Sequence, residues 1–296
     1  MKIYGGIEAG GTKFVCMLGN NPDEVMVQTR FPTTDPDETI GKAVEFFNKN
    51  IGSNSLEAVG IGSFGPVDLD PASEKFGHIT TTPKPGWEDA NISGRIQAAL
   101  DIPVAFDTDV NAAAYGEHLW GAAKGIDPMI YITIGTGIGA GGIFNGKPMH
   151  GLVHPETGHM RLPHDWEDDP FPGICPYHGD CFEGLASGPA IKERWEKSGE
   201  KLPIDHPAWD LEATYIALAL SNLICVLSPR RIVIGGGVMH QENLLSLVQQ
   251  KVQDTLNGYI KSSEIINHID RYIVLPGLGD QAGVLGAIAL AENLNV

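Results

Sequence analysis

Short apolar stretches that alternate with polar residues open the chain and predict β-strands. Residues 3–8, 13–19 and 25–31 each show this pattern, and Gly10-Gly11-Thr12 joins the first two. Alternation over short runs bounded by glycine is typical of strands joined by tight turns. The first thirty residues therefore predict an antiparallel three-stranded meander.

Helical and strand-like patterns then alternate. Pro36-Asp37-Glu38-Thr39 is a typical helix start, and apolar Ile40, Val44 and Phe47 follow at helical spacing. The apolar run 56–63 predicts a buried strand. The pattern that follows predicts a helix at 92–100, a strand at 104–107 and a helix at 112–120. Such alternation favours an α/β fold.

The second half of the chain repeats the plan of the first. Residues 129–134 predict a strand, and Gly135-Thr136-Gly137-Ile138-Gly139 leads from it into another strand. No Gly-Lys-Ser/Thr follows, which excludes a Walker loop, and a strand after the turn excludes a Rossmann fingerprint. The turn at Gly10 taken alone is better explained as an ordinary hairpin. Two such glycine turns, which let backbone approach a phosphate closely, predict a duplicated fold with a nucleotide held between its halves.

The remaining patterns complete an alternating chain. The sequence predicts a helix starting at 186–190, a strongly apolar helix at 211–227 and a buried strand at 231–234 that ends in Gly235-Gly236-Gly237. Three glycines after a strand permit a flat ring to stack there, and adenine is one candidate. An amphipathic segment at 241–256, a last strand at 272–275 and a helix at 279–294 follow.

Composition narrows the class of protein. The 296 residues are 42% hydrophobic and carry a formal net charge of −17, which argues against a general surface for nucleic acid or anionic membranes. It does not exclude a small anionic ligand, because backbone amides bind phosphate without net positive charge. Cys16 and Cys225 are expected to be buried thiols, as in a reducing cytoplasm. We find no signal-peptide core and no run of transmembrane length, so we expect a soluble cytoplasmic protein.

A candidate metal site lies between residues 154 and 184. Cys175, His178 and Cys181 follow one another at two-residue intervals, and His159 is upstream in Glu156-Thr157-Gly158-His159. Two cysteines and two histidines suit tetrahedral Zn²⁺, with His159 as the fourth ligand. Glu156 and Glu183 are interleaved and would be presented to a polar ligand. The alternative is a pair of buried cysteines near scattered surface histidines.

Three further stretches offer candidate chemistry. Asp109 lies where a strand passes into a helix, so its carboxylate could accept a proton from a substrate hydroxyl. The alternative is that Asp109 or Asn111 is a helix N-cap. If this stretch is considered without the other motifs, the N-cap is favoured. The turn 63–68 follows a buried strand and could line a cleft. The loop Thr81-Thr82-Pro83-Lys84-Pro85-Gly86-Trp87 suits a binding loop and a surface connection about equally.

Taken together, these motifs resemble the ROK family of sugar kinases over essentially the whole chain. The segments EAGGTK and TIGTGIG are similar to its two phosphate motifs, and IVIGGGV to its adenosine motif. The Glu156-x-Gly158-His159 segment, the Cys/His knuckle and Glu183 resemble its zinc and sugar signature. The Thr-Pro-Lys-Pro-Gly-Trp loop and CPYHGDCFEG resemble the fructokinase branch in particular.

The resemblance implies a fold and an arrangement of lobes. The fold would be the duplicated actin-like ATPase (ribonuclease H-like) α/β fold, with two lobes around a nucleotide and sugar cleft and a zinc-binding loop. Residues 1–117 with 279–296 would form the small lobe and 118–278 the large lobe. The family resemblance also implies a homodimer.

The resemblance assigns roles to residues of this chain. Asp109 would be the catalytic base. Gly65, Thr108, Asp109, Glu156, His159 and Glu183 would surround the sugar, with His159 also ligating zinc through its other nitrogen beside Cys175, His178 and Cys181. Gly10, Gly11, Thr12, Lys13, Thr133, Thr136 and Gly137 would surround the phosphates, and Pro189, Gly236 and Gly237 would border the adenosine.

Four positions depart from the family pattern. Glu8 stands where Asp is usual near the magnesium water shell, and Thr108 replaces the common Asn before the base. His178 replaces a common Cys, and Gly65-Pro66 inverts the usual Pro-Gly order. None of these changes removes a catalytic group.

The implied reaction is phosphorylation of a hexose by ATP at its primary hydroxyl, with Mg²⁺ on the nucleotide and a structural Zn²⁺. Fructose is the first expected substrate; glucose, mannose and N-acetylhexosamines are alternatives. A sugar-sensing repressor of the same family would need an N-terminal helix-turn-helix, whereas a strand begins at Ile3. A plain ATPase would leave the knuckle residues without a purpose. We therefore expect hexose and ATP as partners, and neither nucleic acid nor membrane.

Overall fold

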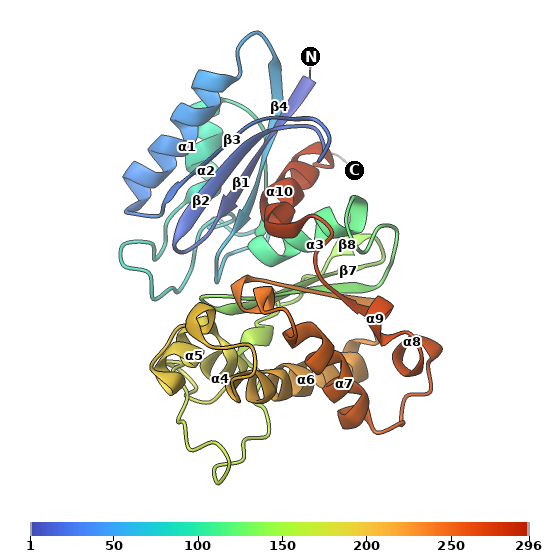
Figure 1. The fold of residues 1–296 in the computed structure, drawn as a ribbon. Coiled ribbons are helices and arrows are strands. Elements are labelled where there is room, and N and C mark those ends of the chain that lie inside the picture. The colour runs from blue at the N-terminus through green and yellow to red at the C-terminus, as the bar shows by residue number, and fades with distance from the viewer. Residues whose placement is uncertain (1, 295–296) are drawn as a thin grey trace. The chain divides into compact units, whose positions relative to one another are not determined.

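The computed structural model describes residues 2–294 (Figure 1). The chain forms two compact units. The first comprises residues 1–125, 141–155 and 277–296, and the second comprises residues 126–140 and 156–276.

A five-stranded sheet organises the first unit, in the order β3-β2-β1-β4-β5. Antiparallel pairing of β1 with β2 and of β2 with β3 confirms the predicted meander. Strands β4 and β5 add in parallel to β1, as strands separated by helices do. The elements are β1 (Lys2–Ala9), β2 (Lys13–Gly19), β3 (Val25–Pro32), α1 (Pro36–Asn50), β4 (Ser55–Ser63), α2 (Ile92–Leu100), β5 (Val104–Thr108), α3 (Asp109–Leu119), β8 (Lys147–Pro148), η4 (Gly279–Gln281) and α10 (Ala282–Glu292).

Strand β2 shows why this sheet carries helices on both faces. Phe14, Cys16 and Leu18 belong to a core cluster that includes residues of α1 and α2. The intervening Val15 and Met17 pack instead with Val284, Leu285 and Ile288 of α10. Successive strand side chains point to opposite faces, so an uninterrupted apolar strand requires a cover on each.

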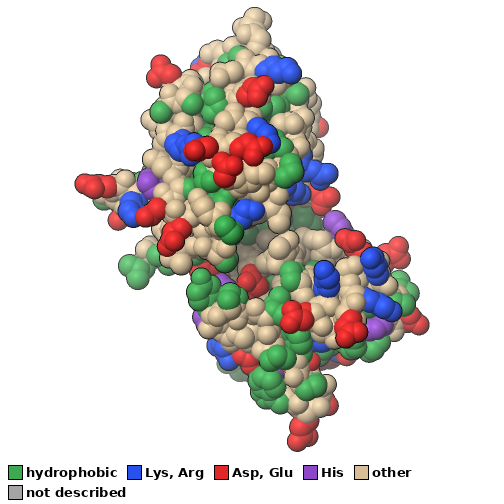
Figure 2. Space-filling view, turned by 90° about the vertical axis from the view of Figure 1, so that its left-hand side faces the viewer, with side chains coloured by type: hydrophobic (Ala, Val, Ile, Leu, Met, Phe, Trp, Pro, Cys, Tyr) green, Lys and Arg blue, Asp and Glu red, His purple; other side chains and the backbone are tan. Residues whose placement is uncertain are grey.

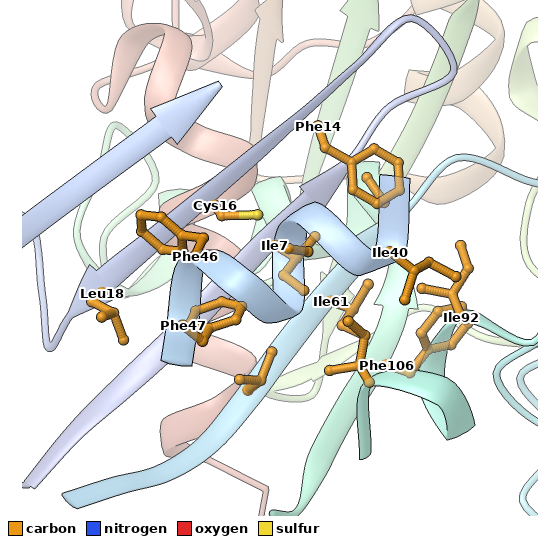
Figure 3. Packing of buried hydrophobic residues seen from close by; sticks show 14 of the residues in the cluster. Ile7, Phe14, Cys16, Leu18, Ile40, Phe46, Phe47, Ile61, Ile92 and Phe106 are labelled. Atoms are coloured by element: carbon orange, nitrogen blue, oxygen red, sulfur yellow. The ribbon is translucent and has the colours of Figure 1, made fainter. Parts of the chain in front are cut away.

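The larger cluster is the main core of the first unit (Figure 3). Ile40, Phe46 and Phe47 of α1 pack over Ile7, Ile61 and other strand residues, with Phe46 and Phe47 edge to face at 5.2 Å between ring centroids. On the opposite face, α10 approaches the strands very closely. A Cβ on Gly60 would lie 1.8 Å from the carbonyl oxygen of Ala287, so only glycine permits this contact.

Parallel strands form the centre of the second unit. Strand β9 pairs in parallel with β10 on one side and β6 on the other, and β7 begins in this unit and ends in the first, where it pairs with β8. The elements are β6 (Met129–Ile134), β7 (Ile138–Phe144), η1 (Thr157–His159), α4 (Phe182–Ala186), α5 (Gly188–Trp195), η2 (Gly199–Lys201), α6 (Ala208–Leu227), β9 (Arg231–Gly235), η3 (Gly237–His240), α7 (Leu244–Leu256), α8 (Ser263–Ile266), α9 (Ile269–Tyr272) and β10 (Ile273–Val274).

Helix α6 corrects two expectations. Its 20 residues include a window of mean hydropathy 1.5, so by length and composition it could cross a membrane, contrary to our prediction that no run is long enough. It packs against α4 and α7, and 56% of that window is buried, as in the core helix of a globular unit. Cys225, expected to be buried, is exposed on this helix, whereas Cys16 is buried as predicted.

Several element boundaries differ from the prediction. Helix α3 begins at Asp109 and not at 112, and Thr108 is its N-cap because its side chain accepts from the backbone N–H of Asn111. The alternative interpretation, in which Asp109 or Asn111 is the N-cap, is therefore wrong. Strand β10 is only two residues long, because Tyr272 belongs to α9, and α7 begins at Leu244.

Acidic and basic side chains are interspersed on the face shown in Figure 2.

Candidate functional site

The first glycine turn is closed by its own backbone and supported from a neighbouring loop. Gly10 N–H donates to the carbonyl of Lys13 at 3.0 Å, and the Thr33 hydroxyl donates to the carbonyl of Gly10 at 2.7 Å. A Cβ on Gly10 would lie 2.8 Å from the Lys13 carbonyl oxygen. Thr12 and Lys13 are exposed at this turn. The turn therefore offers backbone, a hydroxyl and an ammonium group to a ligand.

Glu8 lies beside this turn, at the end of β1, and its carboxylate is incompletely satisfied. Its Oε2 is buried and has no hydrogen-bond partner within residues 2–294. Burial raises the pKa of Glu8, while Lys13 lowers it and Asp280 raises it further. A buried, unpartnered carboxylate oxygen next to an acidic residue suits a hydrated divalent cation.

Asp109 is the first residue of α3 and is half-buried. Its Oδ1 accepts from the N–H of Val110 at 2.8 Å. Two residues earlier, Asp107 is buried and accepts from the N–H of Thr108 and the amide of Asn111. The end of β5 and the start of α3 are thereby fixed, which positions the Asp109 carboxylate in the first unit.

The loop with two prolines proves to be structural. Trp87 is fully buried, contacts Phe64 and donates through Nε1 to the carbonyl of Thr34 at 2.7 Å. The Lys84 ammonium donates to the carbonyl of Thr33 at 3.0 Å, and Thr33 in turn holds Gly10. The loop therefore supports the first glycine turn through Thr33, with its tryptophan in the core.

In the second unit, the second glycine turn is joined to Glu183. Oε2 of Glu183 accepts from the N–H of Ile138 at 2.8 Å, directly after Gly137. The N–H of Gly188 donates to the carbonyl of Gly135 at 2.8 Å, which brings the start of α5 and Pro189 next to the turn. Thr136 is exposed and Thr133 is half-buried on the preceding strand.

The glycines after β9 also lie against this turn region. Gly236 has φ of +92°, and a Cβ there would lie 2.3 Å from the carbonyl oxygen of Ile134. Gly237 has open space where a Cβ would be. The second unit thus brings together Thr136, Gly137, Pro189, Gly236 and Gly237, the residues predicted for phosphate and adenosine.

The predicted metal ligands converge. The ligand atoms of His159, Cys175, His178 and Cys181 all lie within 4.8 Å of one another. Cys175 Sγ is 3.7 Å from Nδ1 of His159 and 3.6 Å from Nδ1 of His178, and Cys181 Sγ is 3.6 Å from Nδ1 of His159. Neighbouring ligands around tetrahedral zinc are separated by roughly 3.3–3.8 Å, from bond lengths of about 2.0–2.3 Å. The donor set and spacing therefore fit Zn²⁺.

Close packing and side-chain contacts hold the backbone around this cluster in place. A Cβ on Gly158 would lie 2.0 Å from the carbonyl oxygen of Ile138, so the segment before His159 fits only with glycine. Arg161 donates to the carbonyl of His178 at 2.6 Å, and both Arg161 and His164 bind the carboxylate of Asp180. Sequence reasoning missed this support, since single charged residues in a loop carry no pattern.

Glu156 and Glu183 are electrostatically coupled. Glu156 is exposed at the surface, but partial desolvation raises its pKa to about 7, and the nearby Glu183 carboxylate raises it as well. Two carboxylates near each other are suited to binding adjacent hydroxyl groups. Burial likewise raises the pKa of the Cys181 thiol to about 11, so a bound cation is what would hold this sulfur as a thiolate.

The comparisons with known proteins agree with these features. A profile described as "ROK family" matches residues 4–294. The chain is 47% identical over 297 residues to a protein named fructokinase from Zymomonas mobilis, which covers 98% of this chain and 96% of that protein. It is 44% identical over 290 residues to a fructokinase of Pediococcus pentosaceus, covering 98% of each. The solved ROK hexokinase of Thermus thermophilus superposes with a TM-score of 0.79 at 25% identity, covering 99% of this chain and 98% of that one.

Proposed function

The chain belongs to the ROK family, and we propose that it is a fructokinase that transfers phosphate from ATP to fructose, giving fructose 6-phosphate. The observation that carries this proposal is the joining of Glu183, in the sugar motif, to the N–H of Ile138, in the second phosphate turn. A kinase must hold its sugar and its nucleotide phosphates in a fixed relation, because most of the catalysis of phosphoryl transfer is positioning and electrostatics.

Asp109 acts as the general base in this proposal. It accepts the proton of the primary hydroxyl as that oxygen attacks the γ-phosphorus. Such a base contributes on the order of 10²–10⁴-fold to the rate. The hydrogen bonds of Asp107 to Thr108 and Asn111 keep this end of β5 rigid, which supports the assignment.

The ligands of the sugar and of the nucleotide in this proposal are the residues that the family resemblance assigns. Gly65, Thr108, Asp109, Glu156, His159 and Glu183 bind the hexose. Gly10, Gly11, Thr12, Lys13, Thr133, Thr136 and Gly137 bind the phosphates, and Pro189, Gly236 and Gly237 bind the adenosine. The orphaned Oε2 of Glu8 fits the water shell of Mg²⁺, which would neutralise charge on the transferring phosphate.

Zinc has a structural role in the proposal. His159, Cys175, His178 and Cys181 would occupy all four positions of a tetrahedral ion and leave none for a catalytic water. With Nδ1 of His159 turned toward the metal, its Nε2 remains as a sugar ligand. The loop bearing Glu156 and Glu183 is thereby held in one conformation.

The test is coupled ADP release with fructose, glucose, mannose and N-acetylglucosamine, run beside a reaction without sugar. Turnover that strongly favours fructose is the expected result. A preference for another hexose would assign the enzyme a different sugar specificity within the family. Equal slow turnover with and without every sugar would identify an ATPase or a sensor and remove the sugar roles of Glu156, His159 and Glu183.

The proposal includes the setting of the enzyme. The net charge of −17 supports a protein that does not act on nucleic acid or anionic membranes. The two thiols of the knuckle support a reducing compartment, the cytoplasm. The homodimer is carried over from the resemblance to the family and is tested by light scattering of the purified protein.

A further inference from the structure

We infer that His154 is a positioning residue for the sugar-binding turn Gly65-Pro66-Val67, and that its imidazole sets the affinity for the sugar. The inference rests on the proposed function, in which Gly65 lies against the sugar. Sequence analysis singled out Gly65 and the carboxylate Glu156, but gave His154 no role.

The imidazole of His154 is bound to this turn directly. Nε2 accepts a hydrogen bond from the backbone N–H of Val67 at 3.0 Å. The residue is only 6% exposed, so water cannot replace this acceptor. A buried backbone N–H without a partner carries the full cost of its desolvation. The hydrogen bond therefore fixes where the backbone of Val67 can lie.

The ring also packs against the glycine itself. A Cβ on Gly65 would lie 3.2 Å from Cε1 and 3.4 Å from Nε2 of His154. The imidazole therefore lies directly against the position that a side chain of residue 65 would occupy. A smaller side chain at position 154 would leave space into which the turn could relax.

The imidazole of His154 must be neutral for its Nε2 to accept a hydrogen bond. Burial lowers its pKa, so the ring is neutral at pH 7. Because Nε2 accepts from Val67, the proton of the neutral ring is on Nδ1. The ionisable groups that face it are Asp107, which raises its pKa, and His150, which lowers it.

The far side of the turn is fixed independently. The carbonyl of Pro66 accepts from both the N–H and the hydroxyl of Thr80, at 2.8 and 3.1 Å, and Val67 forms a β-bridge with Ile79. These contacts come from the segment that follows the turn. His154 comes from a different segment, two residues before Glu156. Among the described residues, it is the only one of this segment whose side chain is hydrogen-bonded to the turn. One imidazole therefore links the Gly65 turn to the chain that carries a sugar carboxylate.

The experiment compares His154→Leu, which removes the acceptor, with His154→Gln, whose amide oxygen reaches the position of Nε2. His268→Leu, at an exposed histidine of the second unit, is the matched control. We expect His154→Leu to raise the KM for fructose roughly tenfold to a hundredfold, the cost of one unsatisfied buried N–H. The KM for ATP should stay within about twofold, and His154→Gln should recover most of the loss.

The possible outcomes are distinct. If the wild-type protein does not phosphorylate fructose, the proposed function is wrong, and the inference about His154 is wrong with it. If it does, an unchanged fructose KM in His154→Leu, equal losses in the KM for fructose and ATP, or no recovery in His154→Gln each overturn the role of His154. Should His154→Leu not fold, His154→Asn, which is too short to reach Val67, is expected to give the same selective loss.

Discussion

The carboxylate of Glu183 accepts a hydrogen bond from the backbone N–H of Ile138 at 2.8 Å. Glu183 is the second residue of α4, which follows the Cys/His knuckle, and Ile138 begins the strand that follows the second glycine turn. A Cβ on Gly137 would lie 2.7 Å from the same Oε2, so the carboxylate lies directly on the turn. In the proposed function, one side chain therefore contributes both to sugar binding and to the position of the second glycine turn.

Substitutions at Glu183 should separate these two roles. Glu183→Gln keeps an acceptor for Ile138 but loses the charge, so we expect the KM for fructose to rise about 10–100-fold with a nearly unchanged KM for ATP. Glu183→Ala also leaves the Ile138 N–H unpaired, so the KM for ATP should rise as well. Steady-state kinetics with zinc content measured in each variant tests this. Equal values of the ATP KM in the two variants would show that the hydrogen bond does not hold the phosphate turn.

Asp109→Asn should nearly abolish turnover while fructose still binds. The amide keeps the local hydrogen bond from Val110, so the start of α3 is preserved, but it cannot accept a proton. We expect kcat to fall by about 10²–10⁴-fold and the dissociation constant for fructose, measured by calorimetry, to change little. Asp101→Asn, at an exposed helix end where Asn is equally suited to positive φ, is the control. A variant that retains the wild-type rate would refute Asp109 as the base.

The local parts of the fold were predictable from sequence. The meander and both glycine turns follow from alternation and glycine spacing, which act over a few residues. Helix α2 was predicted with its exact bounds, because Asn91 caps its start and Asp101 ends it in the left-handed conformation. The metal cluster was predictable since three of its ligands lie in one seven-residue stretch.

Features that depend on distant parts of the chain were not predictable. His154 and Val67 are 87 residues apart, and the burial of Trp87 depends on Phe14 and Phe64. Cys225 was misassigned because α6 is apolar on nearly all sides, and periodicity cannot show which side of such a helix remains exposed. Thr108, Asp109 and Asn111 are all good caps, and only the backbone path selects Thr108.

Removal of one zinc ligand should affect metal and sugar together. Cys181→Ser replaces a thiolate by a hydroxyl, a poor ligand for Zn²⁺, and frees the loop that carries Glu156 and Glu183. We expect the zinc content by elemental analysis to fall well below one per chain and the affinity for fructose to fall with it. Cys225→Ser, at the exposed cysteine of α6, should change neither. Sugar affinity that is unchanged in the metal-free variant would contradict the structural role of zinc.

The pair His150 and Asp107 should make stability depend on pH. Nε2 of His150 lies 2.8 Å from Oδ2 of the buried Asp107, and this hydrogen bond raises the pKa of His150. Because the pKa of His150 is raised in the folded state, the charged imidazole stabilises the fold. This stabilisation is complete below the unfolded-state pKa of about 6.5 and is lost as pH rises through the folded-state pKa.

His150→Gln isolates this charge, because the amide can still donate to Asp107. The free energy of unfolding, measured in urea, should be lower than that of the wild type by up to about 1 kcal/mol at pH 5.5, and the difference should shrink toward pH 8.5. The value is small because the imidazole is 45% exposed and solvent screens the pair. Because His150 also lowers the pKa of His154, the same comparison is made in the His154→Gln background, where that second imidazole is absent. A difference of the same size at both pH values would mean that the hydrogen bond, and not the charge, stabilises this end of β5.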